Sequence, residues 1–521
     1  MKKILAFVLA LTMLLSVCML AGCGEKADPT QGNKPTQGAD PKPTQGNQPA
    51  APVGNFAVPE EGYDGSAVEI KFYNTMGASL LDVLKEYIPE FNKMYPNITV
   101  AVDSIGGYDD VRDQIKTEIT VGNQPNLAYC YPDHVAMYNL AQATVILDDL
   151  IDSKIEVKRA DGTTEILGLT DEQKADFIEG YYNEGKQFGD GLMYTMPMSK
   201  STEVLYYNKT FFEANGLTVP KTWDEMEELC AKIKAIDPTS IPLGYDSESN
   251  WFITMCEQYG SPYTSASGDH FLFDNDTNKA FVKRFHEWYQ KGYLTTQTIF
   301  GAYTSELFKA STGTHSYMSI GSSAGATHQR PEKGADGNYP FEVGITTIPQ
   351  VDAAKAKVIS QGPSLCIFNS KNISDQQVVA SWLFVKFLTT NVEFQAAFGA
   401  ASGYVPVLKS VSDETLAEYE KNDKGEFVLE DGKKKPINAV AHYVEFIDGA
   451  DGGEFIAALS AKVCLEQADA YYTSPAFNGS SEARDQVGNL LTAALTYTGN
   501  DFDSYLDELF MDAIDECEYN S

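Results

Sequence analysis

The sequence is poor in the residues and loops that bind metals and nucleotides. Its 521 residues include six histidines and eight cysteines, and none of these follows the H-E-x-x-H or C-x-x-C spacing of zinc sites. The chain also lacks a Walker loop and a G-x-G-x-x-G fingerprint, the usual phosphate-binding loops of nucleotide enzymes. We therefore expect no metal and no cofactor.

Basic residues are also scarce. The 39 lysines and arginines stand against 73 aspartates and glutamates, so the net charge is −34. A field of this sign keeps a protein soluble and repels nucleic acids and anionic lipid headgroups. We expect no nucleic-acid partner.

Only one long hydrophobic run is present, and it lies at the N-terminus. Met1-Lys2-Lys3 precedes an apolar stretch from Ile4 to Ala21. A charged start, a short apolar middle and small residues at the end are typical of an export signal, whereas a membrane helix needs about 20 apolar residues. Leu20-Ala21-Gly22-Cys23 resembles the bacterial lipobox. Residues 1–22 are then a signal peptide and Cys23 carries the lipid; the alternative is a plain signal peptide with an incidental cysteine.

Residues 23–66 are predicted to form a disordered tether. The part from Gly24 to Pro59 contains a single aromatic residue, Phe56. The motif Pro-Thr-Gln-Gly begins at Pro29, Pro35 and Pro43. Such a composition buries too little apolar area to offset chain entropy. We expect an extracytoplasmic protein, anchored to the cell membrane through this tether.

The rest of the chain alternates between strand and helix patterns. Residues 68–73, 98–102 and 127–131 have the apolar patterns of strands. Between them, apolar residues recur at helical spacing over 80–94 and 111–119. Three strands separated by two helices predict a parallel sheet with right-handed crossovers.

The same pattern returns further along, so we expect at least two α/β lobes. Glu203–Asn208 is predicted to be a strand, Thr222 the N-cap of a helix, and Ser374–Leu388 a helix with a buried face. Asp161-Gly162 and Asp431-Gly432 lie between strand-like arms and predict surface hairpins. A cleft between two lobes is the usual place for a small solute.

Six cysteines remain once Cys18 is removed with the signal peptide and Cys23 is lipidated. They are Cys130, Cys230, Cys256, Cys366, Cys464 and Cys517. Most lie in apolar stretches, so we expect buried free thiols, with a disulfide pair as the alternative.

One enzyme motif occurs, the G-x-S-x-G of Gly321–Gly325 with Ser323 at its centre. A nucleophile elbow needs a strand before this motif, a helix after it and a histidine later in the chain. His328 or His442 follows, but Pro331 would break the helix. A secreted serine hydrolase with Ser323 as nucleophile is the distant alternative, and we expect no enzyme.

Several motifs point to one protein family. They are STEVLYYNKTFFEANGLTVPKTWDEM from Ser201 to Met226, FNKMYPNITV, GNQPN, SIGSSAG, ISQGPSL and SGYVPV. Together they resemble the extracellular solute-binding proteins of ABC importers, and more narrowly the sn-glycerol-3-phosphate-binding branch, from about Val68 to Leu509. The resemblance implies an α/β, two-lobed, periplasmic-binding-protein-like fold with a hinge and an interlobe ligand cleft.

The resemblance also implies where the chain crosses between the lobes. The crossings would lie near residues 194–201, 316–322 and 358–364. The N-terminal lobe then comprises 67–197 and 317–358, and the C-terminal lobe comprises 198–316 and 359–521.

The same resemblance places six residues in the cleft. They are Tyr108, Ser201, Ser322, Gly362, Tyr404 and Arg484. A shift of one position would put Ser323 in place of Ser322. Arginine grips phosphate oxygens with its planar fork, and serine hydroxyls with a glycine amide complete an anion cradle.

The chain departs from the family at the glutamate that binds ligand hydroxyls. Pro132 stands at the matching place, and the adjacent Asp133 is expected to serve instead. Trp251 or Tyr404 would stack on the ligand if it is an oligosaccharide. We expect a monomeric lipoprotein that captures sn-glycerol-3-phosphate or a related glycerophosphate for permease subunits, with carbohydrate binding as the alternative.

Overall fold

The computed structural model describes residues 56–521 except 189, 311–312, 431–432 and 450–455. The predicted signal peptide, Cys23 and the Pro-Thr-Gln-Gly segment lie outside the described residues. The tether ends earlier than predicted, because Phe56 and Tyr63 are buried in a hydrophobic core. Within the part of the chain described, no helix has the length and apolarity to cross a bilayer.

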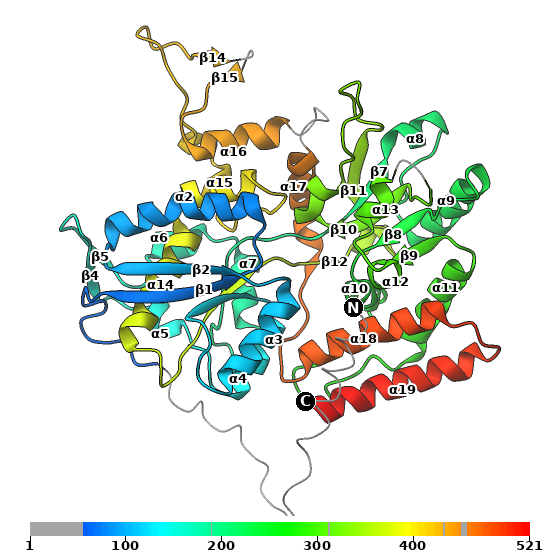
Figure 1. The fold of residues 1–521 in the computed structure, drawn as a ribbon, viewed down its shortest axis with the longest axis horizontal. Helices are drawn as coiled ribbons and strands as arrows, with labels where there is room; N and C mark the ends of the chain where they lie inside the picture. Colours follow the sequence, from blue (N-terminus) through cyan, green and yellow to red (C-terminus); the bar gives the residue numbers. More distant parts are fainter. Residues whose placement is uncertain (1–55, 189, 311–312, 431–432, 450–455) are drawn as a thin grey trace, which may run out of the picture. The chain divides into compact units, whose positions relative to one another are not determined.

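The first of two lobes is built on a five-stranded sheet with the order β2-β1-β3-β13-β6 (Figure 1). Its strands are β1 (Val68–Asn74), β2 (Ile98–Ser104), β3 (Leu127–Cys130), β6 (Met196–Pro197) and β13 (Ser364–Ile367). β1 runs parallel to β2 and β3, as predicted, whereas β13 runs antiparallel to β3 and β6.

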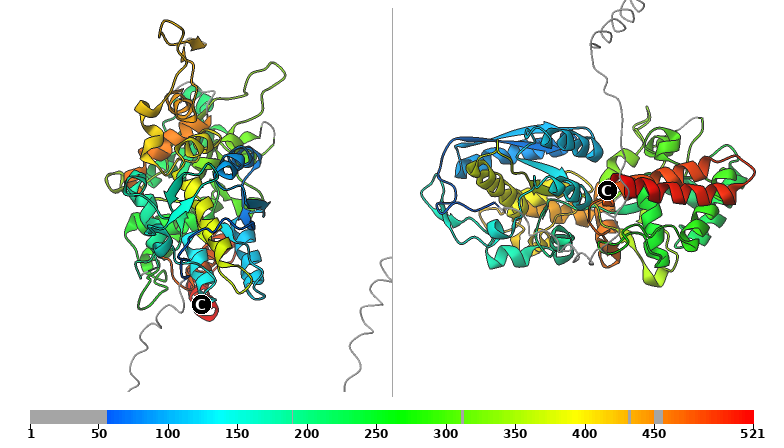
Figure 2. Two further views of the ribbon diagram at one scale, coloured as in Figure 1. Left: turned by 90° about the vertical axis from the view of Figure 1, so that its left-hand side faces the viewer. Right: turned by 90° about the horizontal axis from the view of Figure 1, so that it is seen from below.

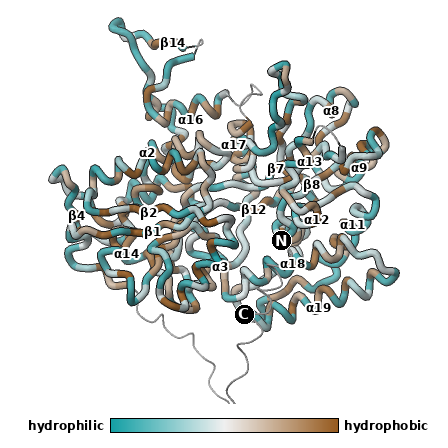
Figure 3. Tube along the Cα trace, viewed as in Figure 1, coloured by the Kyte–Doolittle hydropathy of each residue, from teal (hydrophilic) through white to brown (hydrophobic). Residues whose placement is uncertain are grey.

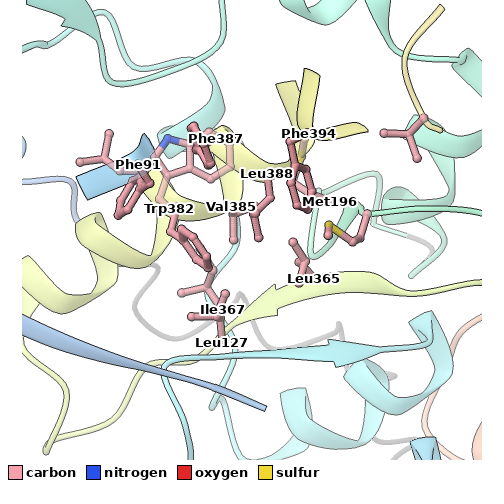
Figure 4. Packing of buried hydrophobic residues seen from close by; sticks show 14 of the residues in the cluster. Phe91, Leu127, Met196, Leu365, Ile367, Trp382, Val385, Phe387, Leu388 and Phe394 are labelled. Carbon is pink, nitrogen blue, oxygen red and sulfur yellow. The ribbon is translucent and has the colours of Figure 1, made fainter. Parts of the chain in front are cut away.

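Helices cover this sheet and bury its apolar side chains. They are α2 (Ala78–Met94), α3 (Tyr108–Ile119), α4 (Pro132–Leu140), α5 (Asp148–Ile151), α6 (Asp171–Asp176), α7 (Glu179–Asn183), α14 (Asp375–Thr390), α15 (Val392–Ala400) and α16 (Ala439–Asp448). Phe91 of α2, Trp382 of α14 and Phe394 of α15 lie in one cluster with Leu127 and Ile367 of the sheet (Figure 4). This packing holds the cleft-facing ends of the strands in fixed positions.

The second lobe has its own five-stranded sheet, with the order β11-β7-β10-β8-β9. The strands are β7 (Glu203–Asn208), β8 (Leu243–Tyr245), β9 (Leu294–Thr296), β10 (Met318–Ser322) and β11 (Val343–Thr347). β7 is antiparallel to β10 and β11, and β8 is parallel to β9 and β10. The start of β7 therefore lies at the same edge as the carboxyl ends of β8 and β10.

The second lobe is also enclosed by helices. They are α8 (Lys209–Ala214), α9 (Trp223–Ile236), α10 (Glu248–Tyr259), α11 (Asp276–Gln290), α12 (Gln297–Phe300), α13 (Ser305–Lys309), α17 (Ile456–Glu466), α18 (Ser480–Thr496) and α19 (Phe502–Asn520). Thr222 caps α9 as predicted, because its side chain accepts a hydrogen bond from the N–H of Glu225. The helices carry mixed apolar and polar colouring along the trace, consistent with one buried and one solvated face (Figure 3).

The strand pairing corrects the predicted lobe boundaries. β10 and β11, within residues 317–358, pair with β7 and so belong to the second lobe. β13 and the two helices after it belong to the first lobe, although they lie within residues 359–521. The two lobes lie side by side in two orthogonal views (Figures 1 and 2). β12 (Val358–Ile359) and β16 (Tyr471–Tyr472) pair in parallel between the lobes.

Two smaller predictions are confirmed. β4 (Glu156–Lys158) pairs with β5 (Thr164–Ile166), and β14 (Leu429–Glu430) pairs with β15 (Lys433–Lys434), which gives the two hairpins. All six cysteines after residue 56 are buried and free.

Candidate functional site

A cleft of about 1100 Å³ is lined by residues of both lobes. Six of the eight predicted site residues line it: Tyr108, Asp133, Ser201, Ser322, Tyr404 and Arg484. The first lobe contributes the starts of α3 and α4 and the turn after α15. The second lobe contributes strand ends of its sheet and the start of α18. Residues far apart in the sequence thus converge on one cavity.

Trp251 and Gly362 do not line the cleft. The ring of Trp251 is fully buried in the second core, where it stacks on Tyr245 with 4.7 Å between ring centroids. The prediction that Trp251 stacks on a sugar is therefore wrong. Gly362 has φ +107°, and a Cβ there would lie 2.6 Å from the carbonyl oxygen of Ser199. A glycine is needed at this position because the backbone of residues 199–201 passes close to it. The adjacent Gln361 lines the cleft instead.

Tyrosines form the first-lobe side of the cleft. Tyr108 opens α3, and its ring stacks on that of Tyr131, with centroids 4.3 Å apart and planes at 19°. Tyr404 lines the same side. Burial raises the pKa of all three hydroxyls, so they stay protonated and can donate hydrogen bonds at neutral pH. We call Tyr108, Tyr131 and Tyr404 the tyrosine wall.

Two carboxyl groups form the facing side, with Glu203 buried and Asp246 partly buried. Glu203 begins β7 and accepts a 2.6 Å hydrogen bond from the hydroxyl of Tyr245. Asp246 follows β8 and accepts one of 2.8 Å from the N–H of Thr304. Burial raises the pKa of Glu203 to about 7 and that of Asp246 to about 6. We call Glu203 and Asp246 the carboxylate wall.

Sequence reasoning missed the carboxylate wall and Tyr131. Glu203 and Asp246 flank two strands that meet at one edge of the sheet, and polar residues at such edges are a known signal of ligand sites. Glu203 lies at that edge because β7 pairs antiparallel with β10, and no local sequence pattern indicates this pairing.

Arg484 of α18 lies between the lobes and contacts side chains of both. Its Nη1 donates a 2.5 Å hydrogen bond to Oδ1 of Asn250, and its Nε lies 3.6 Å from Oδ2 of Asp133. Asp133 belongs to the first lobe, so this ion pair crosses the cleft. The guanidinium therefore has two protein oxygens beside it before any ligand binds.

A second ion pair also joins the lobes. Nη1 of Arg112 in α3 lies 3.2 Å from Oδ2 of Asp485 in α18 and donates to the hydroxyl of Ser481 at 3.1 Å. The side chain of Arg112 is 10% exposed and that of Asp485 is 40% exposed. A partly screened pair of this kind contributes modestly to holding the lobes together.

Carboxyl groups greatly outnumber basic side chains along the cleft. Its described lining contains a single arginine, Arg484, and no lysine. Eight carboxyl side chains line it: Asp109, Asp110, Asp133, Glu184, Glu203, Asp246, Glu306 and Asp485. Only Glu184 is paired with a fully buried lysine, Lys200. The cleft does not attract anions at long range.

Several buried polar atoms that line the cleft have no hydrogen-bond partner in the described part of the protein. They include the hydroxyls of Tyr263, Thr264 and Ser474, Nδ1 of His134 and Oε1 of Gln329. Buried polar groups in proteins are nearly always paired. A ligand rich in hydroxyl groups would supply partners for both donors and acceptors.

Ser323 does not have the surroundings of a nucleophile. Its side chain is fully buried, and its Oγ accepts a 3.2 Å hydrogen bond from the N–H of Thr202. The strand before it is present as β10, but residues 323–329 form a 3₁₀ helix where an α-helix is required. The motif is therefore not a nucleophile elbow.

The match to a known protein family decides the identity of the chain. Residues 86–424 match the family described as bacterial extracellular solute-binding protein. The chain belongs to this family. Its members are located outside the cytoplasm and bind solutes for the permease subunits of ABC importers. They are not enzymes.

Relatives and solved structures agree with this family assignment. The chain is 24% identical over 382 residues to the sn-glycerol-3-phosphate-binding periplasmic protein UgpB of Escherichia coli K12, covering 70% of this chain and 81% of that protein. The UgpB structure of Mycobacterium tuberculosis with glycerophosphocholine matches with TM-score 0.63, 17% identity and coverage of 87% and 98% of the two chains. The Listeria monocytogenes protein Lmo0181 with cycloalternan matches with TM-score 0.62, 15% identity and coverage of 87% and 98%. These similarities confirm the predicted two-lobed fold.

Proposed function

We propose that this protein captures a polyhydroxylated solute in the interlobe cleft and delivers it to an ABC importer. The unpartnered buried polar atoms along the cleft carry the proposal, because hydroxyl groups both donate and accept hydrogen bonds. Closure of two lobes around a solute excludes water and strengthens such contacts.

An oligosaccharide agrees best with the charge and size of the cleft. Carboxylates accept hydrogen bonds from sugar hydroxyls, and the faces of Tyr108 and Tyr131 suit the apolar faces of sugar rings. A volume of about 1100 Å³ also exceeds what a single glycerol phosphate fills. The structural relative Lmo0181 carries a saccharide.

Glycerol phosphate is the second candidate because of Arg484. A guanidinium in a closed cleft binds phosphate oxygens in a bidentate manner, and UgpB of Escherichia coli is a glycerol-3-phosphate-binding relative. Against this, Asp133 and Asn250 already contact Arg484, and a dianion would face the surrounding carboxylates.

Isothermal titration with sn-glycerol-3-phosphate, glycerophosphocholine and neutral oligosaccharides tests both candidates. A true ligand at 100 times its Kd stabilises the protein by about 2.7 kcal/mol, which thermal shift detects. If the ligand is a glycerophosphate, Arg484→Ala abolishes binding and Arg484→Lys is intermediate, because an ammonium cannot match two oxygens at once. For a saccharide, lysine substitutes with little loss. Absence of binding to every member of the panel would argue against the proposal.

We also propose that a lipid at Cys23 anchors the protein to the membrane. Two or more acyl chains hold a protein at a bilayer, whereas a single chain binds reversibly. Cys23→Ser is expected to remove lipid labelling and to release the protein or leave it as a precursor. Equal labelling of wild type and Cys23→Ser protein would refute the anchor.

A further inference from the structure

One aromatic residue of the cleft differs from the tyrosine wall because most of its surface is exposed. Tyr303 lies between α12 and α13 of the second lobe, it lines the cleft, and it is 63% exposed. The other exposed aromatic residues of the described ranges do not line the cleft; they are Tyr259, Phe300, Phe427 and Tyr519. Single exposed rings are common on protein surfaces, but a ring that lines a cleft is within reach of a bound solute.

The backbone next to Tyr303 is firmly held. The N–H of Thr304 donates a 2.8 Å hydrogen bond to Oδ1 of Asp246, and the Thr304 hydroxyl lies 3.1 Å from that of Ser319. Thr304 is fully buried, and a Cβ built on Gly244 of β8 would lie 2.5 Å from the Cβ of Thr304. The glycine therefore lets Thr304 pack directly against the sheet. This packing fixes the position from which Tyr303 faces the cleft.

Tyr303 and Tyr404 approach each other from the two lobes. Tyr404 belongs to the tyrosine wall of the first lobe, whereas Tyr303 comes from the second lobe. Burial raises the pKa of the Tyr404 hydroxyl, and the Tyr303 hydroxyl raises it further. The second effect is electrostatic, so it requires the two hydroxyls to lie near each other. Aromatic side chains of both lobes therefore border the same part of the cavity.

We propose that Tyr303 packs on a sugar ring of the solute from the second lobe, opposite Tyr404. The inference rests on the proposed function and narrows its ligand to a solute that contains a sugar ring. The C–H groups on the face of such a ring are apolar, and an aromatic face covers them. A solute with a ring thus buries apolar surface against Tyr303 when the lobes close, and a glycerol phosphate does not.

A structural role fits Tyr303 less well. The rings that build the second core, such as Trp251 and Tyr245, are fully buried, whereas Tyr303 leaves most of its surface in solvent. Substitution of an exposed side chain away from the core usually changes stability little. Tyr303→Ala should therefore melt at the same temperature as the wild type, so its binding can be measured on a folded protein.

Calorimetric titration with maltotriose, mannobiose and sn-glycerol-3-phosphate tests the inference. For a saccharide that the wild type binds, we expect Tyr303→Ala to weaken binding at least about tenfold, because the stacking contact is lost. Tyr303→Phe keeps the ring and should bind within about threefold of the wild type. Any affinity for sn-glycerol-3-phosphate, which has no ring, should not change. Tyr519→Ala removes an exposed tyrosine outside the cleft lining and should alter no affinity.

Nitration of tyrosines gives a second readout on the wild-type protein. Tetranitromethane modifies exposed tyrosines, so Tyr303 and Tyr519, which is 86% exposed, should both be nitrated in the free protein. A saturating saccharide should slow nitration of Tyr303 several-fold and leave that of Tyr519 unchanged. Mass spectrometry of the peptides measures both rates.

The possible results separate this inference from the proposed function. A saccharide that binds Tyr303→Ala as tightly as the wild type, or that leaves nitration of Tyr303 unchanged, overturns the ring contact and leaves the solute-binding function intact. An equal loss in Tyr303→Ala and Tyr303→Phe would assign the effect to the hydroxyl, against stacking. Binding of sn-glycerol-3-phosphate or glycerophosphocholine without binding of any saccharide overturns this inference alone. Failure of all these solutes to bind removes both proposals.

Discussion

The two sides of the cleft differ in chemistry. The tyrosine wall of the first lobe presents flat rings and neutral hydroxyls, and it comes from the starts of two helices and one turn. The carboxylate wall of the second lobe presents ionisable acceptors at one edge of a sheet. Ring faces bind many solutes with similar strength, whereas carboxylates discriminate between solutes by charge. The difference suggests that the first lobe supplies affinity and the second lobe supplies selectivity.

The largest expected effect concerns the buried ion pair next to the tyrosine wall. Lys200 is fully buried against Glu184, and its backbone pairs with Val405, the residue after Tyr404. Lys200→Met leaves Glu184 buried without its cation, so we expect a loss of about 3–5 kcal/mol in the free energy of unfolding. Chemical denaturation measures it. The double variant Lys200→Met with Glu184→Gln should recover most of the loss, and a single-variant loss below about 1 kcal/mol would contradict the prediction.

The carboxylate wall should make stability depend on pH. Glu203 has a pKa of about 7 in the folded protein and 4.5 as its ordinary value, so the folded state holds the proton more strongly. The contribution of Glu203 to the free energy of unfolding is therefore complete below pH 4.5 and is lost as the pH rises through 7. The loss is on the order of 3 kcal/mol. Asp246, with a pKa of about 6, acts in the same direction. Glu203→Gln should flatten the profile of unfolding free energy between pH 5 and pH 8, and an unchanged slope would rule out Glu203 as its source.

The tyrosine wall should control affinity without controlling the preference for charge. Tyr131→Ala removes a ring that stacks on Tyr108 at 4.3 Å, and we expect a loss of about 1–3 kcal/mol in binding free energy for any solute of the panel. The ratio of affinities for sn-glycerol-3-phosphate and neutral oligosaccharides should stay constant. Tyr131→Phe keeps the ring and is the matched control. A ratio that changes with Tyr131→Ala would mean that the two walls do not act separately.

The sequence predicted the local elements well and the long-range pairing poorly. Periodicity identified β1, α2 and α9, because each depends on neighbouring residues only. The assignment of β10 to the first lobe failed because the pairing of β10 with β7 joins residues more than 100 positions apart, which no local pattern encodes.

The family resemblance predicted part of the cleft lining, and the residues it missed depend on long-range strand pairing. Family motifs led to Tyr108 and Arg484, which line the cleft. Trp251 was misplaced because an aromatic residue on a helix has the same local pattern in a core as beside a ligand. Glu203 was missed because its position at the cleft depends on the direction in which β7 enters the sheet.

The smallest expected effect concerns the ion pair that joins the lobes at Arg112 and Asp485. Asp485→Asn removes the charge at 3.2 Å from Arg112, while Asp109 and Asp113 of the first lobe still compensate the guanidinium. We expect a loss of about 0.5–1 kcal/mol in the closed arrangement, because Asp485 is partly exposed to solvent. Small-angle X-ray scattering should show a slightly larger radius of gyration for the unliganded variant, and solute affinity should fall by about two- to fivefold without a change in charge preference. Asp507→Asn, which removes a surface partner of Lys279 within the second lobe, should change neither quantity. An equal response of both variants would mean that the effect is one of net charge and that the lobes are held together by the walls themselves.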